Sequence, residues 1–210
     1  MLVSSLGHVR SSLSLLSPSA SHLTMTSSDP YANATFRKAN SSDTDVNRIV
    51  ELVHITYRGD VGWTTETEYL GGGRITPEQV REDLARPRSE IILLERPSES
   101  DPNTFELLSC AHIQDENGVG YFGMFSVSPT LQGGGIGKRV IAECERVIRD
   151  EFGLSKITMS VIDVRHSLIA FYERRGYRKT ESYKNFPYGD ERFGIPKRDD
   201  LRFVVLEKDL

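Results

Sequence analysis

The chain has 210 residues, 38% hydrophobic and 27% charged, which is enough for one buried α/β core with extensions. Its formal net charge of −4 argues against nucleic-acid binding, which needs a basic face. Cys110 and Cys144 lie in apolar segments without metal-ligand spacing, so we expect no metal, no disulfide framework and a reducing compartment. No apolar run is long enough to cross a bilayer, so we expect no membrane partner.

The first 30 residues differ in composition from the rest. They are rich in Ser and Leu and have no acidic residue before Asp29. Such a segment resembles an organelle transit peptide, but a disordered leader or an upstream start codon explains it equally, with Met25 as an alternative initiator. We therefore expect a leader over residues 1–30 and one domain over residues 31–210. We expect a cytoplasmic protein, with organelle targeting through residues 1–25 as the alternative.

From residue 35 onward, strand-like and helix-like patterns alternate, which predicts a mixed α/β layer fold. Asp43 can cap a helix in which apolar residues recur at helical spacing. Another should begin at Thr76-Pro77-Glu78-Gln79, where Thr76 and Gln79 can form a capping box. Asn117-Gly118 predicts a tight hairpin turn. Strands are expected over 35–39, 89–96, 105–114, 120–127, 156–162, 177–183 and 201–207, and later helices over 136–152 and 166–175.

The segment Gln132-Gly133-Gly134-Gly135-Ile136-Gly137 lies between a predicted strand and an amphipathic helix. A plain flexible turn would have the same composition. In this position, however, the amides converge at a helix N-terminus, where the helix dipole favours an anion such as a pyrophosphate. The phosphate loop of nucleoside triphosphatases does not fit, because Gln132 and Arg139 replace its first Gly and its Ser or Thr. The dinucleotide fingerprint fails as well, since its third glycine falls at Lys138.

The segment from Val127 to Lys138, VSPTLQGGGIGK, resembles the coenzyme-binding motif of the GNAT superfamily of N-acetyltransferases, Arg/Gln-x-x-Gly-x-Gly/Ala after a Val-x-Pro-like strand end. A second block from Leu168 to Tyr177, LIAFYERRGY, follows at the distance expected for the family's next helix. The resemblance covers about residues 35–210. It implies the GNAT fold, a central and largely antiparallel sheet with one splayed parallel strand pair, flanked by helices. The splay would lie between residues 122–127 and 157–162.

The resemblance also implies acetyl-CoA as the cosubstrate. Main-chain groups of Phe125 and Val127 would pair with its pantetheine arm, and amides from Gly133 to Lys138 would hold its pyrophosphate. Tyr172 matches the position often assigned the proton donor to the departing thiolate, although the same ring could pack on the coenzyme or the core. The expected coenzyme-binding residues are Phe125, Ser126, Val127, Gln132, Gly133, Gly134, Gly135, Ile136, Gly137 and Lys138.

The general base is left open by the sequence. The strand 120–127 contains no carboxylate, although some relatives have a glutamate there. Candidates are His112, Glu66 and Asp163, with a water chain as the other option and a structural role for His112 equally plausible. Arg165 stands where many relatives have Asn, and it fits either a ligand contact or a solvent-exposed helix start.

Residues 58–66 and 186–196 both mix aromatic residues with charges, as a lid over a polar small molecule would, although solvated loops would look the same. From these segments we take Trp63, Glu66, Phe186 and Asp190 as candidate substrate-binding residues. We therefore predict an enzyme that transfers the acetyl group of acetyl-CoA to a primary amine of a small molecule by direct attack in a ternary complex, with a homodimer as an option. Alternatives are a protein lysine or N-terminal acetyltransferase and a non-catalytic acyl-CoA-binding module.

Overall fold

The computed structural model describes residues 29, 31–101 and 103–210. Residues 33–210 form one compact unit, and residues 1–32 are a separate unit. The leader and targeting segment predicted for residues 1–30 therefore lie outside the described residues, apart from Asp29. Within the part of the chain that the structure describes, no helix is both long and apolar enough to cross a membrane.

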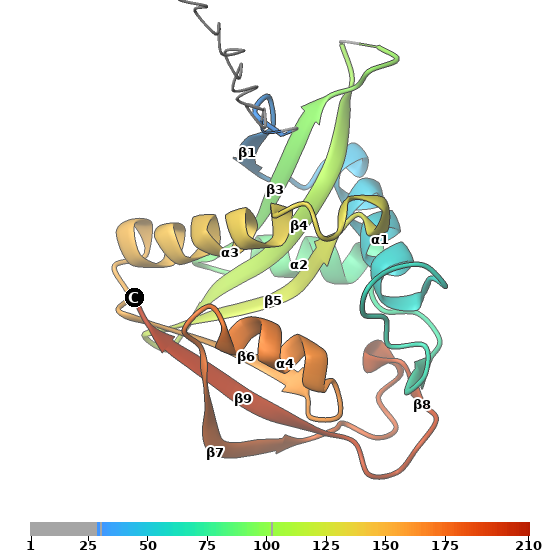
Figure 1. Cartoon of the computed structure of the whole chain (residues 1–210), viewed down its shortest axis with the longest axis vertical. Coiled ribbons are helices and arrows are strands. Elements are labelled where there is room, and N and C mark those ends of the chain that lie inside the picture. The colour runs from blue at the N-terminus through green and yellow to red at the C-terminus, as the bar shows by residue number, and fades with distance from the viewer. Residues whose placement is uncertain (1–28, 30, 102) are drawn as a thin grey trace, which may run out of the picture. The chain divides into compact units, whose positions relative to one another are not determined.

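A seven-stranded sheet organises residues 33–210, with the strand order β1-β3-β4-β5-β6-β9-β7 (Figure 1). Every neighbouring pair is antiparallel except β5 and β6, which are parallel. The predicted mixed sheet with one parallel pair is thereby confirmed. The strands are β1 (Thr35–Lys38), β3 (Ser89–Pro97), β4 (Phe105–Glu116), β5 (Val119–Val127), β6 (Lys156–Ile162), β7 (Arg178–Asn185) and β9 (Arg202–Asp209).

The parallel pair β5 and β6 is joined at only two positions, Gly120 with Ile157 and Tyr121 with Thr158. Beyond them, β5 is distorted by a register shift against β4, and Met124 has a positive φ of 48°. A bulge of this kind bends a strand and increases its twist, so β5 turns away from β6. The splay predicted between residues 122–127 and 157–162 is confirmed, and it opens the sheet at the carboxyl ends of both strands.

Four α-helices cover the sheet: α1 (Asp43–Arg58), α2 (Pro77–Ala85), α3 (Ile136–Arg146) and α4 (His166–Glu173). A π-helical turn, η2 (Val147–Glu151), extends α3. Figure 1 shows α3 in front of β3 and β4 and α2 behind them. Apolar residues recur at helical spacing on α1 and bury themselves against alternate residues of β3, forming a core around Val46, Ile49, Val53, Ile91 and Leu93.

The local signals for helix and turn formation have mixed outcomes. The capping box is confirmed, because Thr76 Oγ1 accepts from the Gln79 amide at 3.3 Å and Gln79 Oε1 accepts from the Thr76 amide at 2.8 Å. The tight turn at Asn117-Gly118 is confirmed by positive φ angles of 57° and 90°. The prediction that Asp43 caps the first helix is wrong: Asp43 is the first helical residue, and the cap is Ser42, whose hydroxyl accepts from the Asp45 amide.

A small second sheet was not predicted. It pairs β2 (Leu70–Gly71) with β8 (Ile195–Pro196) in antiparallel fashion, next to the 3-10 turn η3 (Glu191–Phe193). Two-residue strands are too short to produce an alternating pattern. This pairing matters because it joins the end of the predicted lid segment 186–196 to the stretch that follows the other predicted lid, 58–66.

Candidate functional site

The glycine turn is the first part of the site. It follows β5 through a short 3-10 turn, η1 (Pro129–Leu131), and leads directly into α3. Gly133 and Gly135 have φ angles of 85° and 87°, which favour glycine, and Gly135 is the N-cap of α3. A Cβ added at either position would meet no protein atom within 4 Å. The turn therefore presents bare backbone to an open space.

The amides of Gly133, Gly135, Ile136 and Gly137 have no hydrogen-bond acceptor among the described residues. No side chain caps α3 either. The first amides of a helix carry a partial positive charge and need an acceptor, which water or an anionic ligand supplies. Ile136 is buried, so only its backbone faces this region. The turn is therefore built to receive an anion.

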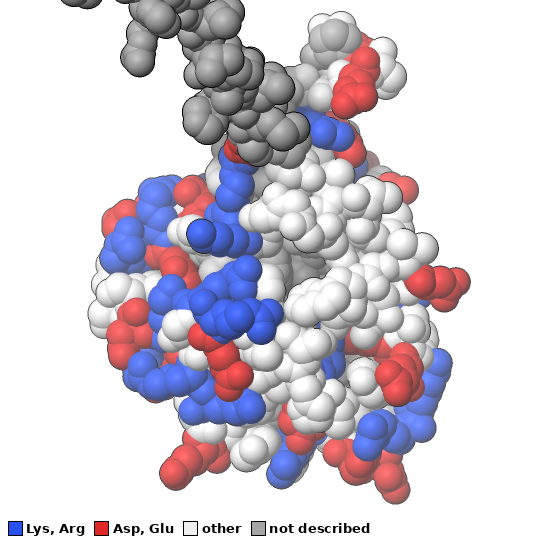
Figure 2. Space-filling model, in the orientation of Figure 1, with Lys and Arg blue, Asp and Glu red and all other residues white. Residues whose placement is uncertain are grey.

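The main cavity lies beside this turn and has a volume of about 210 Å³. Figure 2 shows Lys and Arg side chains gathered beside the hollow on this face, and Lys138 and Arg175 line the cavity. Most of the predicted coenzyme-binding residues line it: Phe125, Val127, Gln132, Gly133, Gly135, Gly137 and Lys138. Gly134, Ser126 and Ile136 do not; the side chains of Ser126 and Ile136 face the interior.

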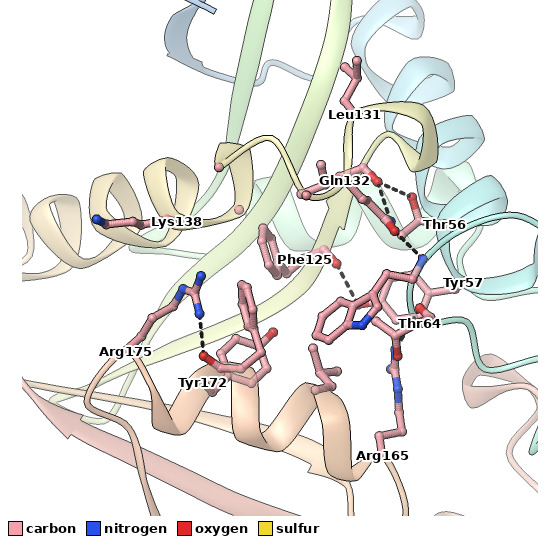
Figure 3. A pocket seen from close by; sticks show the side chains of 17 residues that line it. Thr56, Tyr57, Thr64, Phe125, Leu131, Gln132, Lys138, Arg165, Tyr172 and Arg175 are labelled. Atoms are coloured by element: carbon pink, nitrogen blue, oxygen red, sulfur yellow. Dashed lines mark hydrogen bonds between the residues drawn. The ribbon is translucent and has the colours of Figure 1, made fainter. Parts of the chain in front are cut away.

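Tyr172 reaches the main cavity from α4 (Figure 3). Its ring is buried and packs edge-on against Phe122, Phe171 and Tyr177, with centroid distances of 6.4, 5.4 and 5.8 Å. Among the described residues its hydroxyl has no hydrogen-bond partner. Burial raises the pKa of Tyr172 well above its usual value, so the phenol stays protonated at neutral pH. It therefore places a free proton donor in the cavity.

The end of α1 supplies two hydroxyls that sequence reasoning missed. Tyr57 Oη donates to the carbonyl of Phe125 at 3.2 Å, and Thr56 Oγ1 lies 3.5 Å from the carbonyl of Val127. Both residues line the main cavity, and they tie α1 to the splayed part of β5. The available signal was two adjacent hydroxyl residues at the end of an otherwise apolar helix face. Thr64, Leu131, Arg165, Leu168, Phe171 and Arg175 also line the main cavity.

The segment after α1 lies across the main cavity and is held to the glycine turn by Gln132. The Gln132 side chain accepts from the Trp63 amide and donates to the carbonyl of Val127 at 3.2 Å (Figure 3). The Trp63 indole lies 5.5 Å from the Phe171 ring and is half exposed. Trp63 lines the main cavity.

Glu66 is the centre of a buried ion-pair cluster. Its carboxylate accepts from Arg58 Nη1 at 2.7 Å and from Arg165 Nη1 at 2.8 Å. Arg165 also donates to the carbonyl and hydroxyl of Thr64. Arg165 is therefore not a solvent-exposed helix start; it fastens the lid segment to the start of α4. Both oxygens of Glu66 are engaged by cations.

The other candidates lie elsewhere. His112 Nε2 forms a hydrogen bond of 2.8 Å with Ser89 Oγ. His112 does not line the main cavity, and burial lowers the pKa of its imidazole. Asp163 pairs with Arg202 at 2.6 Å. Phe186 is buried in a small core with Leu70, Ile162 and Leu201. Asp190 caps η3 and pairs with the exposed Arg192. The structure thus places Trp63 beside Tyr172 in the main cavity and Glu66 beside Tyr172 in a second cavity. Phe186 and Asp190 line neither cavity.

A second, smaller cavity of about 70 Å³ occupies the splay between β5 and β6, and we call it the splay cavity. It shares Tyr57, Phe125, Arg165, Leu168 and Tyr172 with the main cavity. The hydroxyl-bearing ring of Tyr172 therefore borders both spaces. No cluster of three or more His, Cys, Asp or Glu side chains suited to a metal ion occurs within the described part of the chain.

Comparison with known families agrees with this architecture. The profile of the Acetyltransferase (GNAT) family matches residues 58–177, which is more than half of the chain. The chain therefore belongs to this family of acyltransferases, as the glycine turn and the block around Tyr172 predict. Among curated proteins, it is similar to a mycothiol acetyltransferase of Salinispora tropica, at 31% identity over 71 residues. The aligned stretch is 34% of this chain and 23% of that relative, so the chain matches less than a quarter of the relative's length.

Solved structures share the fold. A GNAT family acetyltransferase from Elizabethkingia anophelis with acetyl-CoA bound is similar at a TM-score of 0.57 and 14% identity, covering 85% of this chain and 99% of that one. A mutant of the spermidine N-acetyltransferase SpeG from Vibrio cholerae is similar at a TM-score of 0.58 and 14% identity, covering 84% of this chain and 94% of that one. The predicted GNAT fold is thereby confirmed.

Proposed function

We propose that the protein transfers the acetyl group of acetyl-CoA to a primary amine of a small molecule by direct attack in a ternary complex. The observation that carries the proposal is the meeting of two cavities at one free phenol. The main cavity runs from the glycine turn to Tyr172, and the splay cavity approaches Tyr172 from the other side. One substrate can therefore enter from each side and react beside the same hydroxyl.

The chain's own residues fit the donor. The free amides of Gly133, Gly135, Ile136 and Gly137 suit its pyrophosphate. Lys138 and Arg175 at the cavity edge suit its other phosphate charges. The mostly apolar wall formed by Phe125, Val127 and Leu131 suits its pantetheine arm. We therefore keep the coenzyme-binding residues predicted from the sequence, with Ser126, Gly134 and Ile136 contributing through the backbone.

In the reaction, the amine nitrogen bonds to the acetyl carbon and the carbon–sulfur bond breaks. Tyr172 Oη donates its proton to the departing sulfur, and the proton released by the amine returns through water to the phenolate. Burial raises the pKa of Tyr172, whereas the positive charges of Arg165 and Arg175 lower it and so favour transfer of its proton to the departing sulfur. Because Glu66 is held by two arginines, we propose that it positions Arg58 and Arg165 and that water accepts the amine proton.

The lid supports a small acceptor over a protein. Residues 58–74 and 184–200 are joined by the β2–β8 pair, by Lys197 N to the carbonyl of Tyr69 at 2.9 Å, and by Lys197 Nζ to the carbonyl of Thr67 at 2.6 Å. Such a closed rim suits a compact molecule better than an extended peptide. On the basis of the sequence, we also propose that residues 31–210 form the single domain, that the protein is cytoplasmic, and that it forms a homodimer.

The test is release of free thiol from acetyl-CoA in the presence of small amines, peptides with a free lysine, and peptides with a free N-terminus. We expect turnover with small amines and none with peptides. Peptide turnover alone would replace the small-molecule assignment. Tight acetyl-CoA binding by calorimetry with no turnover of any acceptor would instead favour the binding module.

A further inference from the structure

A third cavity lies behind the splay cavity, with a volume of about 270 Å³, and we call it the outer cavity. It shares Arg74, Tyr121 and Met124 with the splay cavity. The three spaces therefore adjoin one another in the order main, splay, outer, with shared side chains at each boundary. Since the main cavity suits the acetyl donor, an acceptor amine would reach Tyr172 through the outer cavity.

Arg74 lines both the splay cavity and the outer cavity. It lies between β2 and α2, and its guanidinium carbon stacks 4.9 Å from the centroid of the Tyr57 ring. Within the described part of the chain, the structure gives Arg74 neither an ion pair nor a hydrogen bond from its side chain. A guanidinium stays charged at any physiological pH, so Arg74 presents five donors to the cavity.

The charges around the splay cavity do not balance. Its only acidic lining residue is Glu66, whose charge is already shared between Arg58 and Arg165. Its other potential anions are the phenols of Tyr57, Tyr121 and Tyr172. Burial raises the pKa of all three, that of Tyr121 to about 12, so these groups are neutral. Arg74 and the arginine excess around Glu66 therefore leave a net positive charge beside the reacting position. A positive field lowers the pKa of an amine and disfavours a cationic polyamine.

The outer cavity is different. Asp83 is paired with Arg86 at 2.8 Å, and Arg192 with Asp190. The carboxylates of Glu82 and Glu116 also line this cavity and have no ion-pair partner among the described residues. Arg74 is the one charged residue that lines both the outer and the splay cavity. An anionic group near the reacting nitrogen therefore finds Arg74, whereas more remote parts of the acceptor face a mixed surface.

We propose that the acceptor is an amino acid or a similar short molecule with a carboxylate close to its amine, and that Arg74 binds this carboxylate. The splay cavity is large enough for the amine and its adjoining carbon, and the outer cavity can take the remainder. Arg74 would fix the carboxylate bidentately and so orient the amine toward the thioester. This inference rests on the proposed acetyltransferase function and adds the substrate class.

The test compares matched acceptors at one acetyl-CoA concentration: phenylalanine, its carboxamide and phenethylamine, then lysine, its carboxamide and 1,5-diaminopentane, and spermidine. Rates of thiol release are divided by the fraction of neutral amine, because the carboxylate changes the amine pKa. A charge-assisted hydrogen-bond pair predicts a kcat/KM about 10- to 100-fold higher for the free acid in at least one series. Arg74→Gln should remove this preference while changing kcat/KM for the carboxamide less than about threefold.

Two further variants serve as controls for Arg74→Gln. Arg74→Lys keeps the charge without the bidentate fork and should retain part of the preference, and it serves if Arg74→Gln fails to fold. Arg81→Gln changes an arginine that pairs with Asp43 outside these cavities and should leave the preference intact. If the wild type turns over the carboxamides or diamines as fast as the free acids or faster, the role of Arg74 is wrong, but the acetyltransferase proposal stands. A loss that is equal for acids and carboxamides in Arg74→Gln does the same, whereas failure of every acceptor counts against the acetyltransferase proposal itself.

Discussion

The donor half and the acceptor half of the site are built in opposite ways. The donor half is mainly backbone: glycines with positive φ, a helix N-terminus and the end of one strand, all within residues 125–138. The acceptor half is mainly side chains, and its ion pairs join Glu66 to Arg165, which are 99 residues apart. Backbone sites depend on local conformation, whereas side-chain sites depend on which distant segments meet. The first kind is therefore visible in a short motif and the second is visible only in the folded chain.

The largest effect is expected where the two halves meet. Tyr172→Phe removes the free hydroxyl and keeps the ring contacts with Phe122 and Phe171. Loss of a general acid lowers kcat by about 10²- to 10⁴-fold, and we expect the Kd for acetyl-CoA to stay within about threefold. Steady-state kinetics and calorimetry measure the two quantities.

The control for this variant is Tyr177→Phe, which also loses a buried hydroxyl, one that hydrogen-bonds to Glu145 rather than facing the cavity. It should lower thermal stability and leave kcat unchanged. A normal kcat in Tyr172→Phe would mean that Tyr172 only packs, and the two halves would then meet at some other group.

The next effect concerns the acceptor half. Glu66→Gln leaves the buried cations Arg58 and Arg165 without their counter-charge, and breaking a buried pair from one side costs about 3–5 kcal/mol. We expect a clearly lower melting temperature, whereas Glu68→Gln, an exposed neighbour, should change it little. The same variant tests the general base. If Glu66 accepted the amine proton, the low-pH limb of the kcat profile would disappear in Glu66→Gln; we expect that limb to keep its shape.

These cases explain what could be predicted from the sequence. The strands, the helices and the glycine turn depend on periodicity and on caps such as Thr76 and Gln79, which are local. Arg165 was an unexplained departure from the family pattern, because its partner Glu66 lies far away in the chain. Phe186 looked like a lid aromatic because its neighbours are polar. It is buried instead, since the unpredicted β2–β8 pair folds its segment over Leu70 and Leu201.

The donor half can be tested with one methyl group. Gly135→Ala places a Cβ at a φ of 87° that projects into the open space beside the free amides. Gly153→Ala adds the same group at a φ of 67°, also with no protein atom within 4 Å, but remote from the cavity. Both variants bear a similar backbone strain of about 1 kcal/mol. We expect only Gly135→Ala to weaken acetyl-CoA binding, by about tenfold or more, in calorimetric titrations. Equal Kd values for the two variants would remove the glycine turn from the coenzyme site.

The smallest effect should come from Trp63, which belongs by sequence to the acceptor lid but is hydrogen-bonded through its backbone to Gln132 of the donor half. It is the only tryptophan of the chain, so its fluorescence reports on this contact alone. Acetyl-CoA should shift that fluorescence, because the indole lines the main cavity beside Phe171.

Trp63→Ala removes the contact between the two rings, worth about 1 kcal/mol, and should raise the Kd for acetyl-CoA about three- to tenfold, while Trp63→Phe should largely preserve it. The backbone amide that donates to Gln132 remains in both variants, so the difference between them measures the ring. If Trp63→Ala instead raised KM for the amine and left the Kd for acetyl-CoA unchanged, the segment would serve the acceptor. The boundary between the two halves would then pass between Trp63 and Gln132 rather than between Trp63 and Glu66.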